Sequence, residues 1–304
     1  MNNSPDRLSR AVQSDDVQIS FEFFPPKTEK MEEKLWASIK RLEPLLPRFI
    51  SVTYGAGGST RERTHTTLGR VLQETSLAPA AHLTCVNASK SEVNEVIESY
   101  RDIGVRHIVA LRGDPPDGLS GTYHPHPEGY VNAADLVAGI RRIGGFEISV
   151  SAYPEKHPES ASFDADMDML KAKLEAGATR AITQFFFDND HYFRYLDRVQ
   201  AAGIDIPVTP GIIPIHNYKQ IASFAKQTGT DIPDWLHARF DGLENDLETQ
   251  KLVAASVAAE QVTELVDQGV SEFHFYTLNR ADLVYAICHL LGHKPSPVPV
   301  TEAV

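Results

Sequence analysis

The stretches "SYRDIGVRHIVALRG" (99–113) and "KLEAGATRAITQFFF" (173–187) decide the fold class. Each one begins in an amphipathic helical pattern, passes through a glycine and continues into a run rich in β-branched and aromatic residues. Glycine is common just past the end of a helix, and a short apolar run with such a boundary predicts a buried strand. Both stretches therefore predict a helix followed at once by a strand, the repeating unit of α/β proteins.

The same alternation of strand-like and helix-like patterns extends along the chain. Thr28 is the predicted N-cap of one helix, and Ser89 and Gly104 bound another. Strands that are apolar on both faces and are each followed by a helix are expected to be parallel and buried. We predict strands at 17–24, 48–54, 79–85, 106–113, 146–153, 180–187, 206–212 and 272–278.

Eight such units in about 250 residues match the number and size of a closed (β/α)8 barrel, or TIM barrel. An open, doubly wound sheet is the alternative, but neither standard glycine-rich nucleotide motif supports it. A long helical pattern at 246–269, preceded by "TDIPDWLHARFDGLEND" (230–246), predicts extra helices between the last two strands. We expect an α/β barrel over residues 17–292, with disordered segments at 1–16 and 293–304.

The composition narrows the possible partners and cellular location. The chain has 304 residues and a formal net charge of −12, which argues against nucleic acid or an anionic membrane as a partner. Its first 18 residues lack the apolar core of a signal peptide, and no apolar run is long enough to span a membrane. The two cysteines, Cys85 and Cys288, form no CxxC pair. We expect a cytoplasmic protein without disulfides or a metal site.

Polar residues stand near the end of nearly every predicted strand, where the active sites of such barrels lie. Each has a structural alternative: Glu22 can belong to an ion pair, Asp114 can cap a turn, and His82 can be a core histidine. His124 and His126, in "HPHPE", are expected to be solvated loop residues because no ligand partner stands at metal-binding spacing. The strand-end residues are Glu22, Thr53, Tyr54, His82, Thr84, Arg112, Asp114, Tyr153, His157, Gln184 and Tyr276.

Eight stretches in the chain resemble, in order, those of the methylenetetrahydrofolate reductases of the bacterial single-domain type. The likeness covers residues 17–292. It implies a (β/α)8 barrel, non-covalent FAD and a homo-oligomer. The implied activity is two-step (ping-pong) reduction of methylenetetrahydrofolate to 5-methyltetrahydrofolate by NADH or NADPH. The matching stretches are "SFEFFPPKT", "SVTYGAGGSTRERT", "HLTC", "RHIVALRGDPP", "AYPEKHPE", "RAITQFFFD", "GIIPI" and "FHFYTLNR".

The resemblance also assigns roles to individual positions. The family's general acid matches Glu22, and its carboxylate beside the flavin matches Asp114. The positions that match substrate-binding residues are Gln184, Phe224, Tyr276 and Arg280. Those assigned to the flavin are Thr53, Tyr54, His82, Arg112, Gly113, Asp114, Tyr130, Asn132, Ala152, Tyr153, His157, Asp166 and Lys173.

The chain departs from the family pattern where relatives hold the adenosine half of the flavin. Asn132, in "VNAADLV" (131–137), stands where relatives often carry tyrosine, and Tyr130 is the nearby substitute. Met169 and Ala172 stand where relatives often have polar or basic residues. We therefore expect a weaker hold on the adenosine-diphosphate half of FAD.

The implied chemistry makes a demand on Glu22. The substrate's ring must open to an iminium before it can take a hydride, and opening requires a proton from an acid that is still protonated near pH 7. A glutamate in water has a pKa of about 4.3, and apolar surroundings raise it. Strand alternation points Phe21 and Phe23 away from Glu22 and leaves Phe24 on its side. We therefore expect other strands to supply an apolar pocket.

Two other functions remain compatible with the residues. One is a different enzyme on the same barrel, such as an aldolase, although no strand ends in a lysine that could form a Schiff base. The other is a flavin- or folate-binding protein without catalytic activity. The presence of bound flavin, and its bleaching by NADH, would separate these possibilities.

Overall fold

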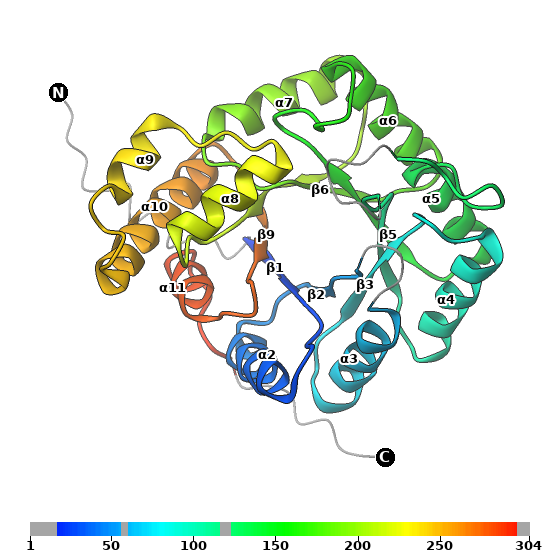
Figure 1. The fold of residues 1–304 in the computed structure, drawn as a ribbon, viewed down its shortest axis with the longest axis horizontal. Helices are drawn as coiled ribbons and strands as arrows, with labels where there is room; N and C mark the ends of the chain where they lie inside the picture. The colour runs from blue at the N-terminus through cyan, green and yellow to red at the C-terminus, as the bar shows by residue number, and fades with distance from the viewer. Residues whose placement is uncertain (1–16, 56–59, 116–122, 297–304) are drawn as a thin grey trace.

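The computed structural model of the protein describes residues 17–55, 60–115 and 123–296. Nine parallel strands line a nearly closed barrel with helices around it (Figure 1). The predicted α/β barrel with extra helices is therefore confirmed. Outside the described residues lie the predicted disordered segment 1–16, residues 56–59 of "SVTYGAGGSTRERT", residues 116–122 and residues 297–304. Residues 293–296 still contact the barrel, because the Ser296 N–H donates to the Pro44 carbonyl over 2.8 Å.

The described elements alternate as the sequence predicts. The strands are β1 (Gln18–Phe23), β2 (Phe49–Val52), β3 (Pro79–Thr84), β4 (His107–Leu111), β5 (Glu147–Ala152), β6 (Arg180–Thr183), β7 (Val208–Thr209), β8 (Gly211–Ile212) and β9 (Glu272–Tyr276). The helices are α2 (Glu29–Leu42), the 3-10 turn η1 (Glu43–Leu45), α3 (Arg61–Glu74), α4 (Lys90–Asp102), α5 (Ala133–Ile143), α6 (Phe163–Glu175), α7 (Asn189–Ala201), α8 (Tyr218–Thr228), α9 (Asp234–Phe240), α10 (Leu247–Asp267) and α11 (Asp282–Leu290).

The helix boundaries follow from local chemistry. The Thr28 hydroxyl accepts the Met31 N–H at the start of α2, and Ser89 forms a capping box with Glu92 at the start of α4. Gly104 follows the end of α4 with a φ of +99°, a conformation that residues with a side chain rarely adopt. The predicted caps at Thr28, Ser89 and Gly104 are therefore confirmed.

The seventh strand position differs from the prediction. We predicted one strand over 206–212, but Pro210 divides it into β7, which pairs with β6, and β8, which pairs with β9. Proline has no N–H to donate to a ladder, so a continuous strand cannot form there. The Pro210 carbonyl accepts the His274 N–H, and the Gly211 N–H donates to Thr183 Oγ1 over 2.8 Å. Two short strands thus close the barrel.

The strands present an apolar outer surface and a mixed interior, in which Phe49, Ala80, Val109 and Ile182 form a small apolar cluster. Phe21 and Phe23 are fully buried in a cluster with Leu35 and Ile39 of α2, as the predicted alternation requires. The interior holds polar side chains such as Ser149, whose hydroxyl lies 2.8 Å from a His107 ring nitrogen. Polar side chains thus lie beside this apolar cluster inside the barrel.

A buried cation closes the opposite, amino-terminal end of the barrel. The Arg180 side chain is 4% exposed and pairs with Glu147 at 2.5 Å and Glu272 at 3.4 Å. These residues begin β6, β5 and β9, so the ion pairs join three strands at their first positions. Ligands must therefore enter from the other end.

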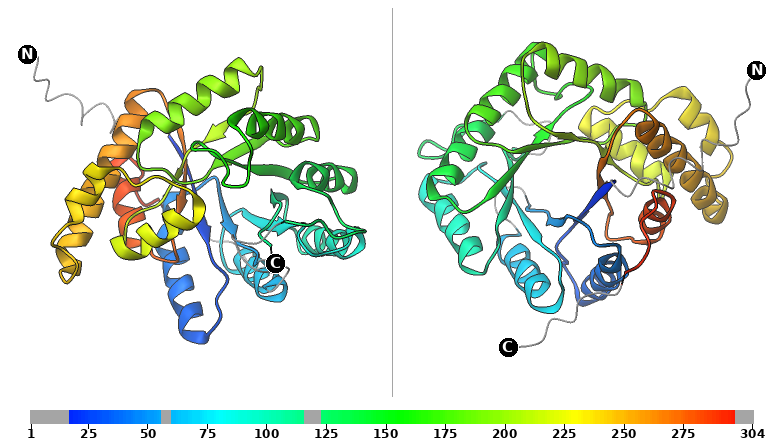
Figure 2. Two further views of the ribbon diagram at one scale, coloured as in Figure 1. Left: turned by 45° about the horizontal axis from the view of Figure 1, so that its top comes forward. Right: turned by 180° about the vertical axis from the view of Figure 1, so that it is seen from behind.

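Helix α10 occupies the place in the ring between α7 and α11, where its Val262 and Leu265 pack in one cluster with Phe273 of β9 (Figures 1 and 2). The additional helices are α8 and α9, and α9 lies at the outer edge of the molecule. Their presence between the last two strand positions confirms the predicted insertion. Within the described ranges, no helix combines the length and apolarity needed to cross a membrane.

The barrel closure predicts a contrast between two glycines. A Cβ at Gly211 would collide with the Thr183 carbonyl and lie 2.6 Å from the Tyr276 ring, whereas a Cβ at Gly69 in α3 meets nothing within 4 Å. We expect Gly211→Ala to lower the free energy of unfolding by about 2 kcal/mol. Gly69→Ala should raise it by about 0.5–1 kcal/mol. Urea unfolding of both variants tests this, and equal effects would contradict the close approach at the closure.

Candidate active site

Three titratable side chains from β1, β3 and β9 meet inside the barrel near the strand ends. Glu22 Oε2 lies 3.2 Å from His82 Nε2 and 3.6 Å from His274 Nε2. The Glu22 side chain is only 12% exposed, and the ring of His274 is 1% exposed. The Ser20 hydroxyl, one pleat deeper on β1, lies 2.7 Å from His274 Nδ1. Glu22 therefore lies between two imidazoles inside the barrel, near the strand ends.

The two histidines reverse the expected effect of burial on Glu22. Burial raises the pKa of Glu22, but His82 and His274 together outweigh it and lower the pKa to about 2. The expected net rise in this pKa is thus wrong, although burial acts in the expected upward direction. Burial also lowers the pKa of His274, and the nearby carboxylate opposes this only in part. These shifts leave Glu22 ionised and His274 neutral at pH 7.

Sequence reasoning missed His274 and Ser20. The available signal was strand parity, because His274 is two residues before Tyr276 in "EFHFYTL" and so faces the same side of its strand. The register between strands carries the remaining information. Ser20 pairs with His274 and Glu22 pairs with Tyr276 across β1 and β9.

Aromatic side chains line the wall formed by β6, α8 and β9. The Tyr276 hydroxyl donates to the Thr183 carbonyl over 2.6 Å, and burial raises its pKa far above the ordinary value. The Phe185 ring contacts Tyr276 edge-on and stacks on Phe224 with centroids 5.9 Å apart. Phe224 is 42% exposed, so part of this wall is open to solvent. Gln184, at the end of β6, accepts the Phe185 N–H through Oε1.

Three basic side chains gather near the ends of β4 and β5. Burial lowers the pKa of His157, and the nearby Arg112 lowers it further. Burial likewise lowers the pKa of Lys173 to about 8; Arg112 adds to this and Asp166 opposes it. Lys173 Nζ donates to the Ser151 carbonyl over 2.9 Å, while Arg112 pairs with Glu159. The predicted residues Arg112, His157 and Lys173 thus form one cationic cluster.

The neighbouring predicted residues support this cluster. The Asp166 carboxylate accepts the backbone N–H of His157 over 2.8 Å. The Tyr153 and His157 rings meet edge-on with their centroids 4.6 Å apart. Gly113 has a φ of +85°, and a Cβ there would lie 2.5 Å from Val86 Cγ1, so the chain requires glycine at this turn. The exposed Asp114 follows directly.

Four further predicted residues lie at or just after strand ends. Thr53 and Tyr54 follow β2, and Ala152 is the last residue of β5. Burial raises the pKa of Tyr54. Arg280 follows β9, where its N–H donates to the Thr277 carbonyl over 2.9 Å.

The structure does not bring Tyr130 and Asn132 to these groups. Tyr130 is 1% exposed and its hydroxyl donates to Asn94, while a Cβ at Gly139 would collide with its ring. Asn132 is the N-cap of α5, and its side chain accepts the Asp135 N–H. Packing and helix capping therefore account for both residues.

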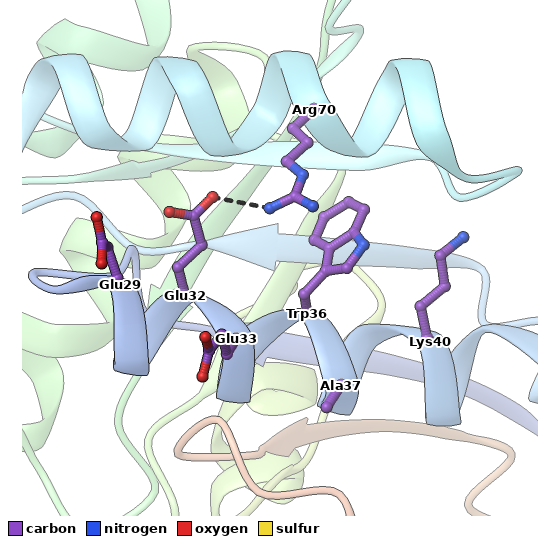
Figure 3. Close-up of a pocket in the computed structure, with 7 residues that line it drawn as sticks. All are labelled: Glu29, Glu32, Glu33, Trp36, Ala37, Lys40 and Arg70. Carbon is purple, nitrogen blue, oxygen red and sulfur yellow. Dashed lines mark hydrogen bonds and ion pairs between the residues drawn. The ribbon is translucent and has the colours of Figure 1, made fainter.

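A hollow of about 500 Å³ on the outer wall, between α2 and α3, has no part in this arrangement. Its charged groups bind one another, since Arg70 lies over the Trp36 ring and donates to Glu32 (Figure 3). Within the part of the chain that the structure describes, no cluster of three or more His, Cys, Asp or Glu side chains is suited to a metal ion. The strand ends are thus the candidate active site.

The family model described as "Methylenetetrahydrofolate reductase" matches residues 7–292. The chain belongs to this family. It is 52% identical over 280 residues to a 5,10-methylenetetrahydrofolate reductase of Pectobacterium carotovorum, with 92% of this chain and 91% of that protein covered. The Escherichia coli K12 enzyme of the same name is 51% identical, with 92% of each chain covered. The family assignment makes the protein an enzyme, an oxidoreductase of folate metabolism.

The fold of this family member is also similar to that of a solved Clostridium thermocellum protein that binds two copies of 5-methyl-5,6,7,8-tetrahydrofolic acid. The TM-score is 0.58 at 14% identity, with 93% of this chain and 97% of that chain covered. At this level of identity the likeness shows the shared barrel alone.

The buried lysine of the cationic cluster gives a prediction about stability. The pKa of Lys173 is lowered from 10.5 to about 8, so folding disfavours its charged form. Replacing it by methionine removes that cost and loses the hydrogen bond to Ser151. We expect Lys173→Met to raise the free energy of unfolding at pH 7 by about 2 kcal/mol.

The expected advantage depends on pH. Between pH 8 and 10.5 the unfolded chain keeps the lysine proton longer than the folded chain, so wild-type stability rises and the difference shrinks. Urea unfolding from pH 7 to 10 measures this, with Lys171→Met on the exposed face of α6 as the control. A constant difference across this range would contradict the buried charge.

Proposed function

We propose that the protein reduces 5,10-methylenetetrahydrofolate to 5-methyltetrahydrofolate, using FAD and a nicotinamide donor in two half-reactions. The observation that carries this proposal is the arrangement at the barrel mouth. A buried carboxylate between two imidazoles lies at the ends of β1, β3 and β9, and a cationic cluster lies at the ends of β4 and β5. The first is suited to proton transfer and the second to a diphosphate.

The donor set fits a flavin dinucleotide. Arg112 lowers the pKa values of both His157 and Lys173, so an anion beside these three side chains would relieve an existing repulsion. The buried Thr84 hydroxyl, at the end of β3, has no hydrogen-bond partner among the described residues. Gly113 turns the chain beside this cluster with a φ of +85°. These groups would hold the diphosphate and the flavin's polar edge.

The chemistry that a bound flavin supplies is hydride transfer, first from the nicotinamide and then to the folate. The residues of the chain supply binding and the proton. The exposed face of Phe224, stacked on Phe185, offers a surface for a flat ring at the mouth. The Tyr276 hydroxyl is engaged in a hydrogen bond to the Thr183 carbonyl, so Tyr276 forms a wall of the site. Proton transfer is left to Glu22.

Glu22 must hold a proton when the folate ring opens. Burial is the largest influence on its pKa and acts upward, while the histidines act downward. A flat substrate over the carboxyl removes the remaining water and strengthens the upward effect. His82, whose Nε2 lies 3.2 Å from the Glu22 carboxylate, is then the group through which a proton can return to Glu22. Glu22 is thus the proposed general acid.

Asp114 completes the proposed electrostatics. It is exposed and directly follows the turn at Gly113. A carboxylate beside the reacting rings favours a cationic iminium, because opposite charges attract.

We include NADH as the preferred donor, a homo-oligomer and the cytoplasm in this proposal. The two cysteines are unpaired and buried, which suits a reducing compartment.

The direct test is the colour of the purified protein. We expect a yellow protein that bleaches under anaerobic NADH and regains its colour when methylenetetrahydrofolate is added. Absorbance near the flavin maximum measures both steps. A colourless protein that takes up no added FAD would overturn the proposal, and bleaching without reoxidation by the folate would favour a different reductase.

The acid assignment predicts a separation of the half-reactions. Glu22→Gln cannot donate a carboxyl proton, so we expect the folate half-reaction to slow by about 10²–10⁴-fold. Flavin reduction by NADH needs no such acid and should remain within a factor of about two. Stopped-flow absorbance measures each step. Glu33→Gln, the same change on the exposed face of α2, is the control; equal losses in both half-reactions of Glu22→Gln would contradict the assignment.

A further inference from the structure

The turn that follows β9 holds the last residues of β1. The Glu22 carbonyl accepts the Thr277 N–H over 3.2 Å and the Thr277 hydroxyl over 2.6 Å. Asn279 reaches the next exposed backbone groups, two residues further along. Its Oδ1 accepts the Phe24 N–H over 2.8 Å, and its Nδ2 donates to the Phe24 carbonyl over 2.9 Å. Phe24, two residues after Glu22, thus has both of its backbone polar atoms held by the Asn279 side chain.

The Asn279 side chain makes the hydrogen bonds that Phe24 would make if β9 were longer. If the parallel ladder continued beyond Tyr276, Phe24 would bond to the Thr277 carbonyl and the Asn279 N–H. Both groups are used elsewhere: Thr277 O accepts the Arg280 N–H over 2.9 Å, and the Asn279 N–H donates to Thr277 Oγ1 over 3.1 Å. The side-chain amide therefore substitutes for one peptide group of the ladder.

The two prolines after Phe24 make this contact hard to replace. Pro25 and Pro26 have no N–H, so Phe24 supplies the last backbone donor before Lys27. On the other side of β1, the Phe23 carbonyl already accepts the Thr53 N–H over 2.9 Å. Without the amide of Asn279, the chain beyond Glu22 would have no ladder partner on the β9 side.

The conformation of the turn selects asparagine. Leu278 and Asn279 have φ angles of 50° and 55°, a left-handed region that asparagine tolerates better than most residues. The Asn279 carbonyl accepts the Ser38 hydroxyl over 2.9 Å, which ties the turn to α2. Asn279 is 8% exposed, so water does not compete for its amide.

We propose that Asn279 is a positioning residue for Glu22, because its amide keeps β1 extended through Phe24 and so holds the Glu22 carboxylate between His82 and His274. This inference rests on the proposed function, in which the position of Glu22 controls proton delivery to the folate. The amide itself touches backbone only, so it acts through Glu22 and has no direct part in the chemistry.

The test replaces the amide while preserving the turn. Asn279→Gly removes both hydrogen bonds to Phe24, and glycine accommodates the φ of 55° without strain. We expect the folate half-reaction to slow by about 10–100-fold, since a small misplacement of a catalytic group has effects of this size. Its pH profile should also shift, because the carboxylate loses its fixed distance from the two imidazoles. Flavin reduction by NADH should stay within a factor of about two.

Ser38→Ala is the matched control. It removes the hydrogen bond from the Ser38 hydroxyl to the Asn279 carbonyl and leaves the amide in place. We expect the wild-type pH profile from this variant, even where its thermal stability falls. If Asn279→Gly does not fold, Asn279→Asp serves in the same assay. It keeps the acceptor for the Phe24 N–H and loses the donor to the Phe24 carbonyl, so the folate step should again be the slower one.

Three outcomes would overturn the inference. These are a wild-type pH profile in Asn279→Gly, equal losses in both half-reactions, or a raised half-saturating folate concentration alone, which would place the effect at the adjacent Arg280. Failure of the proposed function has a different pattern. In that case the wild-type protein does not reduce the folate, or Glu22→Gln still does, whatever Asn279→Gly shows.

Discussion

The pairing of β1 with β9 is the constraint on which the site depends. It joins segments about 250 residues apart and sets Ser20 beside His274 and Glu22 beside Tyr276. Because side chains alternate along a strand, a shift of one residue would turn Glu22 outward toward the apolar surface of α2. The same pairing brings the turn after β9 within reach of Phe24. Closure and catalytic geometry therefore have one origin.

Basic side chains gather at one side of the barrel mouth, although the chain as a whole has a negative net charge. The protein has a net charge of −12, yet Arg112, His157 and Lys173 gather at one side of the mouth. Burying like charges together is unfavourable, and a bound anion offsets that cost. On the other side, two imidazoles stabilise the carboxylate of Glu22. Burial and Arg112 thus disfavour the charged forms of His157 and Lys173, and Glu159 and Asp166 offset this in part.

Local patterns predicted the elements well because their causes are local. Thr28, Ser89 and Gly104 bound helices through contacts within a few residues. The prediction was wrong at 206–212, where Pro210 interrupts the ladder. Most predicted strand-end residues lie at strand ends in the structure, since every parallel strand ends at the same rim. Tyr130 is the clearest exception among the site residues, because its hydroxyl is satisfied inside the core by Asn94.

The sequence by itself determined the class of fold, the family and the rim residues, because periodicity, caps and motifs are properties of neighbouring positions. Only the tertiary structure decided the surroundings of Glu22. Its neighbours along the chain are phenylalanines that point away, whereas His82 and His274 arrive from other strands and reverse the direction of its pKa shift. The amide of Asn279 is likewise invisible as a partner of Phe24 until the barrel closes. Distances across strands arise from register and closure, which no local pattern contains.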